Sequence, residues 1–308
     1  MRILLTGSTG MLGGSIRDEL LRSNQALEIL DPTSYDLDLL DAKSTQSYLQ
    51  QYLPDMIIHC AAKVGGIQAN LNNPWEFIYS NLRIDTNLIG AAIDAKVSSF
   101  FYFGSSCMYP AITEQPMKES QLFSGKLEVT NESYAIAKLT GAKMVEVAAR
   151  QFGLDWHVFI LSNLYGPRDN FDQDSSHLIA AIIKKIYMAL KDGDDCIEMW
   201  GDGKARREFT FVQDVSRFIL SSIGNSRNLP NVLNLGSSCD YSVHEYYQEV
   251  AKIMKFSGLI NPNLNRPSGM QQKLMDSSLA SKFGWLAPTN LYAGLSITVD
   301  YFKSKENS

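Results

Sequence analysis

The sequence predicts an α/β protein built on a doubly wound parallel sheet, and two observations lead to this class. Short runs rich in β-branched and aromatic residues alternate with stretches that are long enough for helices. The chain has 308 residues, of which 45% are hydrophobic and 20% charged. It can therefore bury a full core in one large domain or in two interleaved ones.

The first half of the chain supplies the sheet and the helices that cover it. We expect strands at 3–5, 27–30, 56–59, 100–103 and 156–161, and helices at 11–23, 42–52, 74–96 and 131–152. Strand and helix in strict succession favour parallel strands with both faces covered. Ligands bind such sheets at the carboxyl ends of the strands.

The pattern loosens after about residue 165. We expect helices near 177–191 and 243–256, and short strands near 196–200, 208–212 and 232–236. This part is interpreted as a smaller α/β lobe whose chain crosses back to the sheet.

Three glycines follow the first strand and open the first helix, in the segment Thr6-Gly7-Ser8-Thr9-Gly10-Met11-Leu12-Gly13. Glycine permits a tight turn and lets the backbone approach a pyrophosphate, while the helix N-terminus attracts negative charge. The context predicts a Rossmann-type dinucleotide-binding domain, with an ordinary glycine turn as the alternative. The residues expected at the cofactor are Gly7, Ser8, Thr9, Gly10, Met11, Leu12 and Gly13.

The expected domains are interleaved. The dinucleotide-binding domain spans 1–165 with return segments near 208–236, and the substrate lobe is formed by 166–207 and 237–308.

Tyr134 and Lys138 lie four residues apart on a predicted helix and so share one face. An ammonium beside the phenol favours the ionised form, which predicts a Tyr134 pKa lowered toward neutrality and a role as general acid. A surface contact without chemistry is the alternative for an isolated pair of this kind.

The strand near 100–103 ends in Gly104-Ser105-Ser106-Cys107. A serine hydroxyl at this edge can hydrogen-bond a ketone oxygen beside Tyr134, while Lys138 holds the tyrosine and the cofactor ribose. The thiol has no part in such a reduction.

A ketone acidifies the hydrogens on its neighbouring carbons, so a thiolate at Cys107 can remove one of them. His177, at the start of a predicted helix, is the candidate acid that returns a proton on the opposite face. The alternatives are a small buried residue for Cys107 and a surface helix start for His177.

Composition excludes several classes. The formal net charge of −5, without any block of lysines and arginines, argues against a nucleic-acid partner. The four cysteines lack the spacing of a metal site, and no apolar run approaches the roughly 20 residues that span a membrane. Because the chain begins directly with a strand-like run, we expect no signal peptide and a cytoplasmic location.

Five segments carry a resemblance to a known family. In chain order they are Ala-Ala-Lys-Val-Gly-Gly-Ile at 61–67, Gly-Ser-Ser-Cys-Met-Tyr-Pro at 104–110, Ser-Tyr-Ala-Ile-Ala-Lys at 133–138, Asn-Leu-Tyr-Gly-Pro-Arg-Asp-Asn-Phe at 163–171, and Ser-His at 176–177. With them the chain resembles the GDP-L-fucose synthase family of the extended short-chain dehydrogenase/reductases, to about Tyr301.

The resemblance implies 3,5-epimerisation and 4-keto reduction of GDP-4-keto-6-deoxy-D-mannose with NADPH. It implies that Ser105, Tyr134 and Lys138 serve reduction and that Cys107 and His177 serve epimerisation. It also implies a homodimer paired through the helices at 74–96 and 131–152. The further contacts that it implies are Ser106, Asn163 and Leu164 at the cofactor, and Lys185, Trp200, Arg207 and Lys273 at the GDP-linked substrate.

Departures from the family pattern leave two points open. Thr9 and Ser34 stand where the family usually has arginines for the 2′-phosphate, and Asp31 ends the second strand. A carboxylate there would bind a ribose diol and favour NADH, unless Asp31 only caps a turn before Pro32. Ser268 and Gln272 replace an acid and a base of the family, so another GDP-4-keto sugar, 3,6-dideoxy or heptose, is the alternative substrate.

Two other functions stay open. A reductase that does not epimerise would leave Cys107 idle and give product without solvent deuterium at C3 and C5. A dinucleotide-binding protein without catalysis is the remote alternative, because fold does not imply activity.

Overall fold

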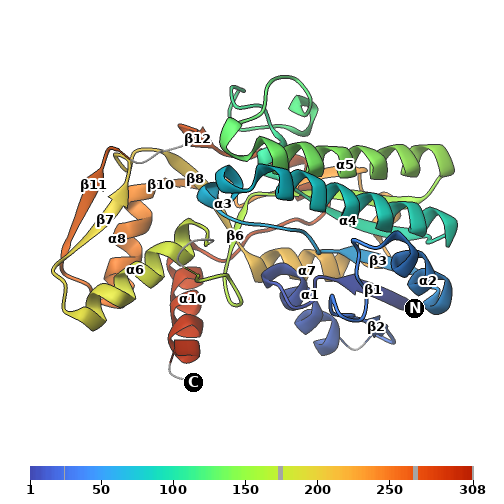
Figure 1. Cartoon of the computed structure of the whole chain (residues 1–308), viewed down its shortest axis with the longest axis horizontal. Coiled ribbons are helices and arrows are strands. Elements are labelled where there is room, and N and C mark those ends of the chain that lie inside the picture. The colour runs from blue at the N-terminus through green and yellow to red at the C-terminus, as the bar shows by residue number, and fades with distance from the viewer. Residues whose placement is uncertain (24, 173–175, 266–269, 307–308) are drawn as a thin grey trace.

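The computed structural model describes residues 1–23, 25–172, 176–265 and 270–306, which form two lobes (Figure 1). Within these residues the larger lobe holds a six-stranded sheet in the order β2-β1-β3-β4-β5-β9, with every pairing parallel. Its strands are β1 Arg2–Thr6, β2 Glu28–Leu30, β3 Met56–His59, β4 Ser99–Ser105, β5 Asp155–Leu161 and β9 Val232–Leu235.

Helices cover both faces of this sheet. The helices on one face are α2 Ala42–Tyr52, α4 Pro74–Asp94 and α5 Glu132–Phe152, and those on the other are α1 Met11–Arg22 and α7 Val212–Ser222. Successive strand residues point to opposite faces. Phe100 and Tyr102 therefore pack beneath α4 and α5, whereas Phe101 and Phe103 share a core with α1 and α7. The predicted fold class is confirmed.

The smaller lobe is made of short strands and three longer helices. Its strands are β6 Asn163–Tyr165, β7 Cys196–Trp200, β8 Arg206–Phe211, β10 Asp240–Ser242, β11 Leu259–Asn263 and β12 Gln272–Lys273, and its helices are α6 Leu178–Asp192, α8 Val243–Met254 and α10 Leu291–Glu306. β8 pairs with β10, β12 and β6, while β7 pairs with β11. The remaining elements of both lobes are short. They are the α-helices α3 Ile67–Asn72 and α9 Ser278–Ser281, and the 3-10 helices η1 Ser106–Met108, η2 Glu119–Gln121, η3 Val129–Asn131 and η4 Ser226–Asn228.

The polypeptide crosses between the two lobes more often than the sequence predicts. Of the return segments expected near 208–236, β9 is an edge strand of the central sheet and α7 packs on one face of it. Strand β8 instead belongs to the smaller lobe, where it pairs with β6. A later segment also returns: Met275 packs in the core beneath α4 and α5, and Trp285 packs in the core beneath α7.

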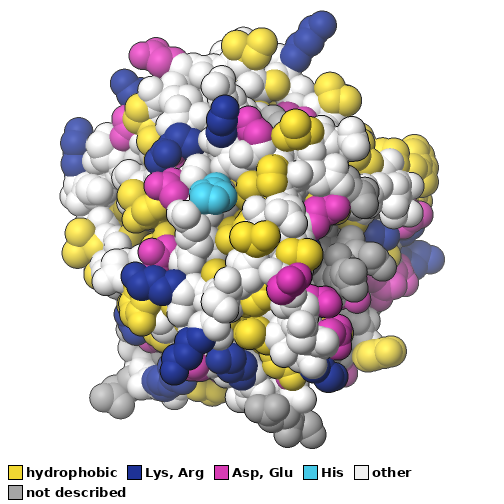
Figure 2. Space-filling model, turned by 90° about the vertical axis from the view of Figure 1, so that its left-hand side faces the viewer, with side chains coloured by type: hydrophobic (Ala, Val, Ile, Leu, Met, Phe, Trp, Pro, Cys, Tyr) yellow, Lys and Arg dark blue, Asp and Glu magenta, His cyan; other side chains and the backbone are white. Residues whose placement is uncertain are grey.

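The end of the smaller lobe carries basic, acidic and apolar side chains interspersed with one another (Figure 2). Across the described part of the chain, no helix combines the length and the apolar character that crossing a membrane requires.

Candidate active site

A cavity of about 790 Å³ lies at the carboxyl edge of the central sheet. This volume is in the range of small-molecule and cofactor sites. The predicted residues that line it are Gly7, Ser8, Thr9, Gly10, Met11, Leu12, Gly13, Ser34, Ser105, Cys107, Tyr134, Lys138, Asn163, Leu164, His177, Arg207 and Lys273. Sequence positions that are far apart thus converge on one site.

The glycine turn forms one end of this cavity. Gly7 has a φ of +71°, and a Cβ on it would lie 2.7 Å from the backbone nitrogen of Ala61. A Cβ on Gly13 would lie 2.1 Å from the carbonyl oxygen of Gly7. Helix α1 then starts after Gly10, which offers no side-chain cap. These features fit a pyrophosphate held by backbone N–H groups.

Asp31 does not take the place expected of it. Its carboxylate accepts a hydrogen bond from Nε of Arg17, on α1, and Asp31 is not among the residues that line the cavity. Ser34 does line the cavity, together with Thr33. The acidic group is therefore directed to α1, and hydroxyls form the cavity wall after β2.

Ser105 and Ser106 differ sharply in their surroundings. Ser105 is the last residue of β4, lines the cavity, and accepts a hydrogen bond at Oγ from the backbone N–H of Cys107 at 3.3 Å. Ser106 is 1% exposed, its Oγ has no hydrogen-bond partner, and it does not line the cavity. The side chain of Ser106 therefore lies in the core, and its expected contact with the cofactor stays a prediction.

Tyr134 lies in the first turn of α5, and Lys138 lies one turn later with 2% of its surface exposed. Burial raises the pKa of Tyr134, and the nearby Cys107 and Asp85 add to the rise. The expectation of a pKa lowered by Lys138 is therefore wrong in direction. The main reason is burial of the phenol, and the Lys138 ammonium lies 3.7 Å from the carboxylate of Asp85, on α4.

Cys107 is held by groups that the sequence does not place together. Its Sγ accepts a hydrogen bond from Nδ2 of Asn131 at 3.1 Å and lies 3.6 Å from Nζ of Lys273. Both neighbours are hydrogen-bond donors that point at the sulfur. This environment suits a base and is unlike the apolar surroundings of a structural cysteine.

His177 enters the cavity from the smaller lobe. It is the residue immediately before α6, and burial lowers its pKa. Cys107 and His177 therefore line the same cavity, one from each lobe.

Comparison with known proteins decides the family. The model of the NAD dependent epimerase/dehydratase family matches residues 3–236. The chain belongs to this family. It is 41% identical to the GDP-L-colitose synthase of Yersinia pseudotuberculosis, with 100% of both chains covered, and 34% identical to the GDP-L-fucose synthase of Escherichia coli (strain K12), with 99% and 98% covered. The resemblance predicted from the sequence motifs is confirmed.

Solved structures agree with this assignment. The chain is similar to a GDP-6-OMe-4-keto-L-xylo-heptose reductase from Campylobacter jejuni, with a TM-score of 0.92, 28% identity, and 99% and 98% of the chains covered. It is also similar to a GDP-mannoheptose C4 reductase from the same organism with NADP bound, with a TM-score of 0.88, 28% identity and 98% of each chain covered.

Arg207 lines this family member's cavity from β8, and its Nη1 donates to the carbonyl of Arg206 at 2.8 Å. Burial lowers its pKa, while Glu128 and Cys107 oppose that shift. Arg207 is thus a half-buried cation that lines the site. Arg206, by contrast, forms an ion pair with Asp240 at 2.8 Å.

Two predicted substrate residues lie outside the cavity lining. Lys185, on α6, donates from Nζ to the carbonyl of Glu198 at 2.5 Å and to the hydroxyl of Tyr247 at 3.4 Å. Trp200, at the end of β7, is 36% exposed. Gln272 donates to Asp240 at 2.7 Å, and Ser268 lies outside the described residues.

Sequence reasoning missed Asn131 and Asp85. Asn131 stands at the N-cap of α5 without making a side-chain cap bond, so its amide is available to Cys107. An N-cap asparagine normally bonds its own helix, and nothing local signals this exception. Asp85 is an acidic residue on the buried face of the amphipathic helix α4. An acid at such a position indicates a buried partner, and this is the feature of the sequence from which its role could have been predicted.

Proposed function

We propose that the protein carries out NADPH-dependent 3,5-epimerisation and 4-keto reduction of GDP-4-keto-6-deoxy-D-mannose, giving GDP-L-fucose. Full-length relatives named GDP-L-fucose synthase support the substrate class. The chemistry is supported by the cavity, which brings two sets of residues together. Ser105, Tyr134 and Lys138 are proposed for reduction, and Cys107 and His177 for epimerisation.

The observation that carries epimerisation is the pair of donors on the Cys107 sulfur, Asn131 at 3.1 Å and Lys273 at 3.6 Å. A thiolate stabilised in this way removes the proton from a carbon next to the ketone. The electron pair moves onto the ketone oxygen, where the hydroxyls of Ser105 and Tyr134 hold the enolate. His177 then donates a proton to the same carbon from the opposite face.

Reduction uses the same oxygen site. NADPH, when bound, supplies a hydride to the ketone carbon. Tyr134 donates its proton to the oxygen, and its raised pKa keeps it protonated at neutral pH. Ser105 holds the oxygen in place.

NADP(H) is the proposed cofactor. The structurally similar GDP-mannoheptose C4 reductase has NADP bound, and the glycine turn of this chain fits a dinucleotide. Asp31 is paired with Arg17, so its carboxylate is partly neutralised and does not face the site where it would repel a 2′-phosphate. NADH stays the alternative until both are compared.

The GDP portion is proposed to lie toward the smaller lobe. Arg207 and Lys273 line the cavity there, and their charges suit diphosphate oxygens. Lys185 and Trp200 are proposed to contact the nucleotide farther out on the same lobe.

A second function is supported by the 41% identity to a GDP-L-colitose synthase and by the heptose reductase structure. In this second function, the protein reduces C4 of another GDP-4-keto sugar, with or without epimerisation. A substrate without a C3 hydroxyl presents only C5 as a stereocentre next to the ketone.

The deciding experiment is turnover of GDP-4-keto-6-deoxy-D-mannose in deuterated water, in parallel with NADPH and NADH, with NMR of the product. GDP-L-fucose carrying deuterium at C3 and C5 supports the proposal. A reduced sugar without deuterium supports a simple reductase. Absence of cofactor oxidation overturns this substrate, and a 3,6-dideoxy or heptose GDP-4-keto sugar is then tested in the same way.

We also propose a homodimer and a cytoplasmic location. The outer face of α4 exposes the stacked rings of Trp75 and Tyr79, and α5 beside it exposes Ile136. Paired α4 and α5 helices from two chains would cover this surface. Sedimentation velocity of the wild type and of Ile136→Arg tests it: a dimer that dissociates in the variant is expected, and a monomeric wild type refutes it.

A further inference from the structure

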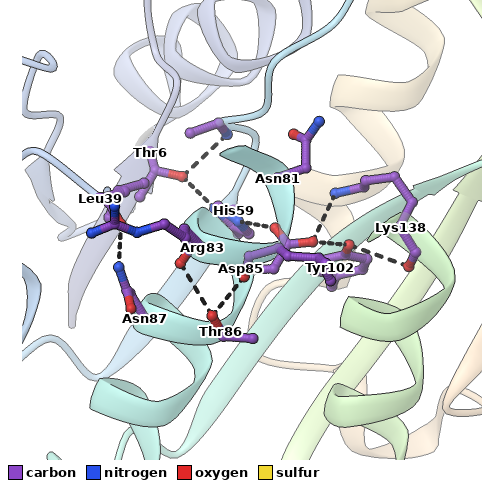
Figure 3. Close-up of polar contacts among 12 residues, drawn as sticks. Thr6, Leu39, His59, Asn81, Arg83, Asp85, Thr86, Asn87, Tyr102 and Lys138 are labelled. Atoms are coloured by element: carbon purple, nitrogen blue, oxygen red, sulfur yellow. Dashed lines mark hydrogen bonds and ion pairs between the residues drawn. The ribbon is translucent and has the colours of Figure 1, made fainter. Parts of the chain in front are cut away.

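Lys138 lies inside a buried polar cluster that joins five elements of the larger lobe (Figure 3). Its ammonium lies 3.7 Å from Oδ2 of Asp85 and 4.0 Å from the centre of the Tyr102 ring. Asp85 comes from α4, Tyr102 from β4 and Lys138 from α5. All three are at most 2% exposed.

The carboxylate of Asp85 is fixed by further hydrogen bonds. Its Oδ2 accepts from the hydroxyl of Tyr102 at 2.5 Å, and its Oδ1 lies 3.1 Å from Nε2 of His59, on β3. Nδ1 of His59 lies 2.7 Å from Oγ1 of Thr6, which accepts from the backbone N–H of Ala61 at 3.3 Å. A neutral His59 with its proton on Nε2 satisfies every donor and acceptor in this row.

The packing is shaped around these atoms. A Cβ on Gly141, on α5, would lie 2.3 Å from the Tyr102 hydroxyl and 2.5 Å from Oδ2 of Asp85. Only a glycine there lets α5 approach α4 closely enough to place Lys138 at the carboxylate. The contact is therefore built into the packing of two helices and does not depend on a flexible surface group.

The charges in the cluster depend on each other. Burial lowers the pKa of Lys138, and the negative charge of Asp85 opposes that shift. Burial would raise the pKa of Asp85, but Lys138, His59 and Tyr102 outweigh it, so this pKa is lowered. The titratable groups that face Lys138 are Asp85 from α4, Tyr102 from β4, His59 and Cys60 from the end of β3, and Tyr134 from α5 itself.

We propose that Asp85 is a positioning residue for the reduction, because its fixed carboxylate keeps Lys138 charged and in place beside the reaction site. This inference rests on the proposed function, in which Lys138 acts next to Tyr134. Asp85 itself does not line the cavity and touches no reacting atom. Without its counter-ion, the effect of burial on Lys138 is no longer opposed by Asp85, and the ammonium loses its proton at a lower pH.

The test replaces Asp85 by asparagine, which has the same shape. Its oxygen still accepts from Tyr102, and its amide N–H donates to Nε2 of His59 when His59 takes the other tautomer. Turnover is measured against pH with saturating sugar and NADPH. In Asp85→Asn we expect the fall of kcat at high pH to move down by about one to three pH units, as expected for loss of an adjacent opposite charge. At the wild-type optimum, kcat drops by about tenfold or more.

A matched control is available outside the cavity. Asp155 forms a similar pair with His157, at 2.9 Å, and accepts from Ser226. Asp155→Asn makes the same chemical change in another partly buried Asp–His pair, and its kcat profile should keep the wild-type pH dependence.

A second readout does not need the substrate. The ¹³Cε signal of Lys138, assigned by its loss in Lys138→Arg, is titrated by NMR in wild type and in Asp85→Asn. A titration that moves to lower pH in Asp85→Asn supports the proposal. An unmoved titration together with an unmoved kcat profile overturns it. If the wild type does not turn over the sugar, the proposed function fails, and this titration still decides whether Asp85 keeps Lys138 charged.

Discussion

The groups proposed for reduction and those proposed for epimerisation are assembled in different ways. Ser105, Tyr134 and Lys138 all come from the larger lobe, on β4 and α5. Cys107 also belongs to that lobe, but its partners His177 and Lys273 come from the smaller one. Reduction therefore depends on packing within one lobe, whereas epimerisation depends on how two lobes meet.

The largest effect is expected for Tyr134→Phe. Loss of the proton donor should slow reduction by roughly 10²–10⁴-fold. Solvent deuterium should still enter the sugar, because Cys107 and His177 remain, but more slowly, because only Ser105 is left to hold the enolate oxygen. NADPH oxidation and deuterium incorporation are measured side by side. Equal loss of both would show that the two halves of the site are not separable.

Cys107→Ala makes the opposite change. Deuterium incorporation should fall by roughly 10²–10⁴-fold, since the base is gone. The control is Cys196→Ala at an exposed cysteine, which should behave as wild type. If Cys107→Ala gives GDP-L-fucose with deuterium at C3 and C5, another residue is the base.

A smaller effect is expected when Cys107 is kept but the ammonium of Lys273 beside its sulfur is removed. Lys273→Met deletes a cation 3.6 Å from the sulfur, and deuterium exchange at saturating sugar should slow roughly tenfold. Lys143→Met, which removes an exposed lysine of α5 paired with Glu146, is the matched control. An unchanged exchange rate in Lys273→Met would mean that the contact does not stabilise the thiolate.

The smallest effect concerns the junction of the lobes. Burial raises the pKa of Glu208 from 4.5 to about 7, although it accepts hydrogen bonds from the backbone N–H groups of Met275 and Ser238. Its folded pKa lies above the unfolded value, so its contribution to stability is complete below pH 4.5 and is lost as pH rises through about 7.

This contribution alone lowers the Tm of the wild type by a few degrees between pH 5 and pH 8, while His59 and His177, whose pKa values are lowered by burial, contribute stability that rises with pH over the same range. Glu208→Gln should have a lower Tm at pH 5 but a shallower dependence on pH. Some slope remains, because burial also raises the pKa of Asp169 to about 7. Parallel Tm curves for wild type and variant would contradict this account.

The sequence predicted the central sheet well because its signals are local. Each buried strand is a short apolar run, and the glycine turn and the Tyr134–Lys138 spacing are read directly from neighbouring residues. Helix α7 was missed because it follows β8 at once, with Phe211 as its N-cap and no polar residue to mark the change.

The site's electrostatics were less predictable because they depend on distant residues. Cys107 and Lys273 are 166 positions apart, and Asp85 meets His59 across 26 positions. The i,i+4 spacing of Tyr134 and Lys138 was correct, but the sign of the Tyr134 pKa shift was not. A partner on another helix holds the ammonium, and burial raises the pKa of the phenol.

The repeated crossing of the chain between lobes has a consequence for synthesis on the ribosome. The core on one face of the central sheet includes Trp285, whose indole N–H bonds the carbonyl of Gly236 just after β9, and the core on the other face includes Met275. Both residues are made long after the strands and helices that they cover. The larger lobe therefore leaves apolar surface uncovered until residue 285 has emerged. During that interval the nascent protein is most exposed to aggregation and most dependent on chaperones.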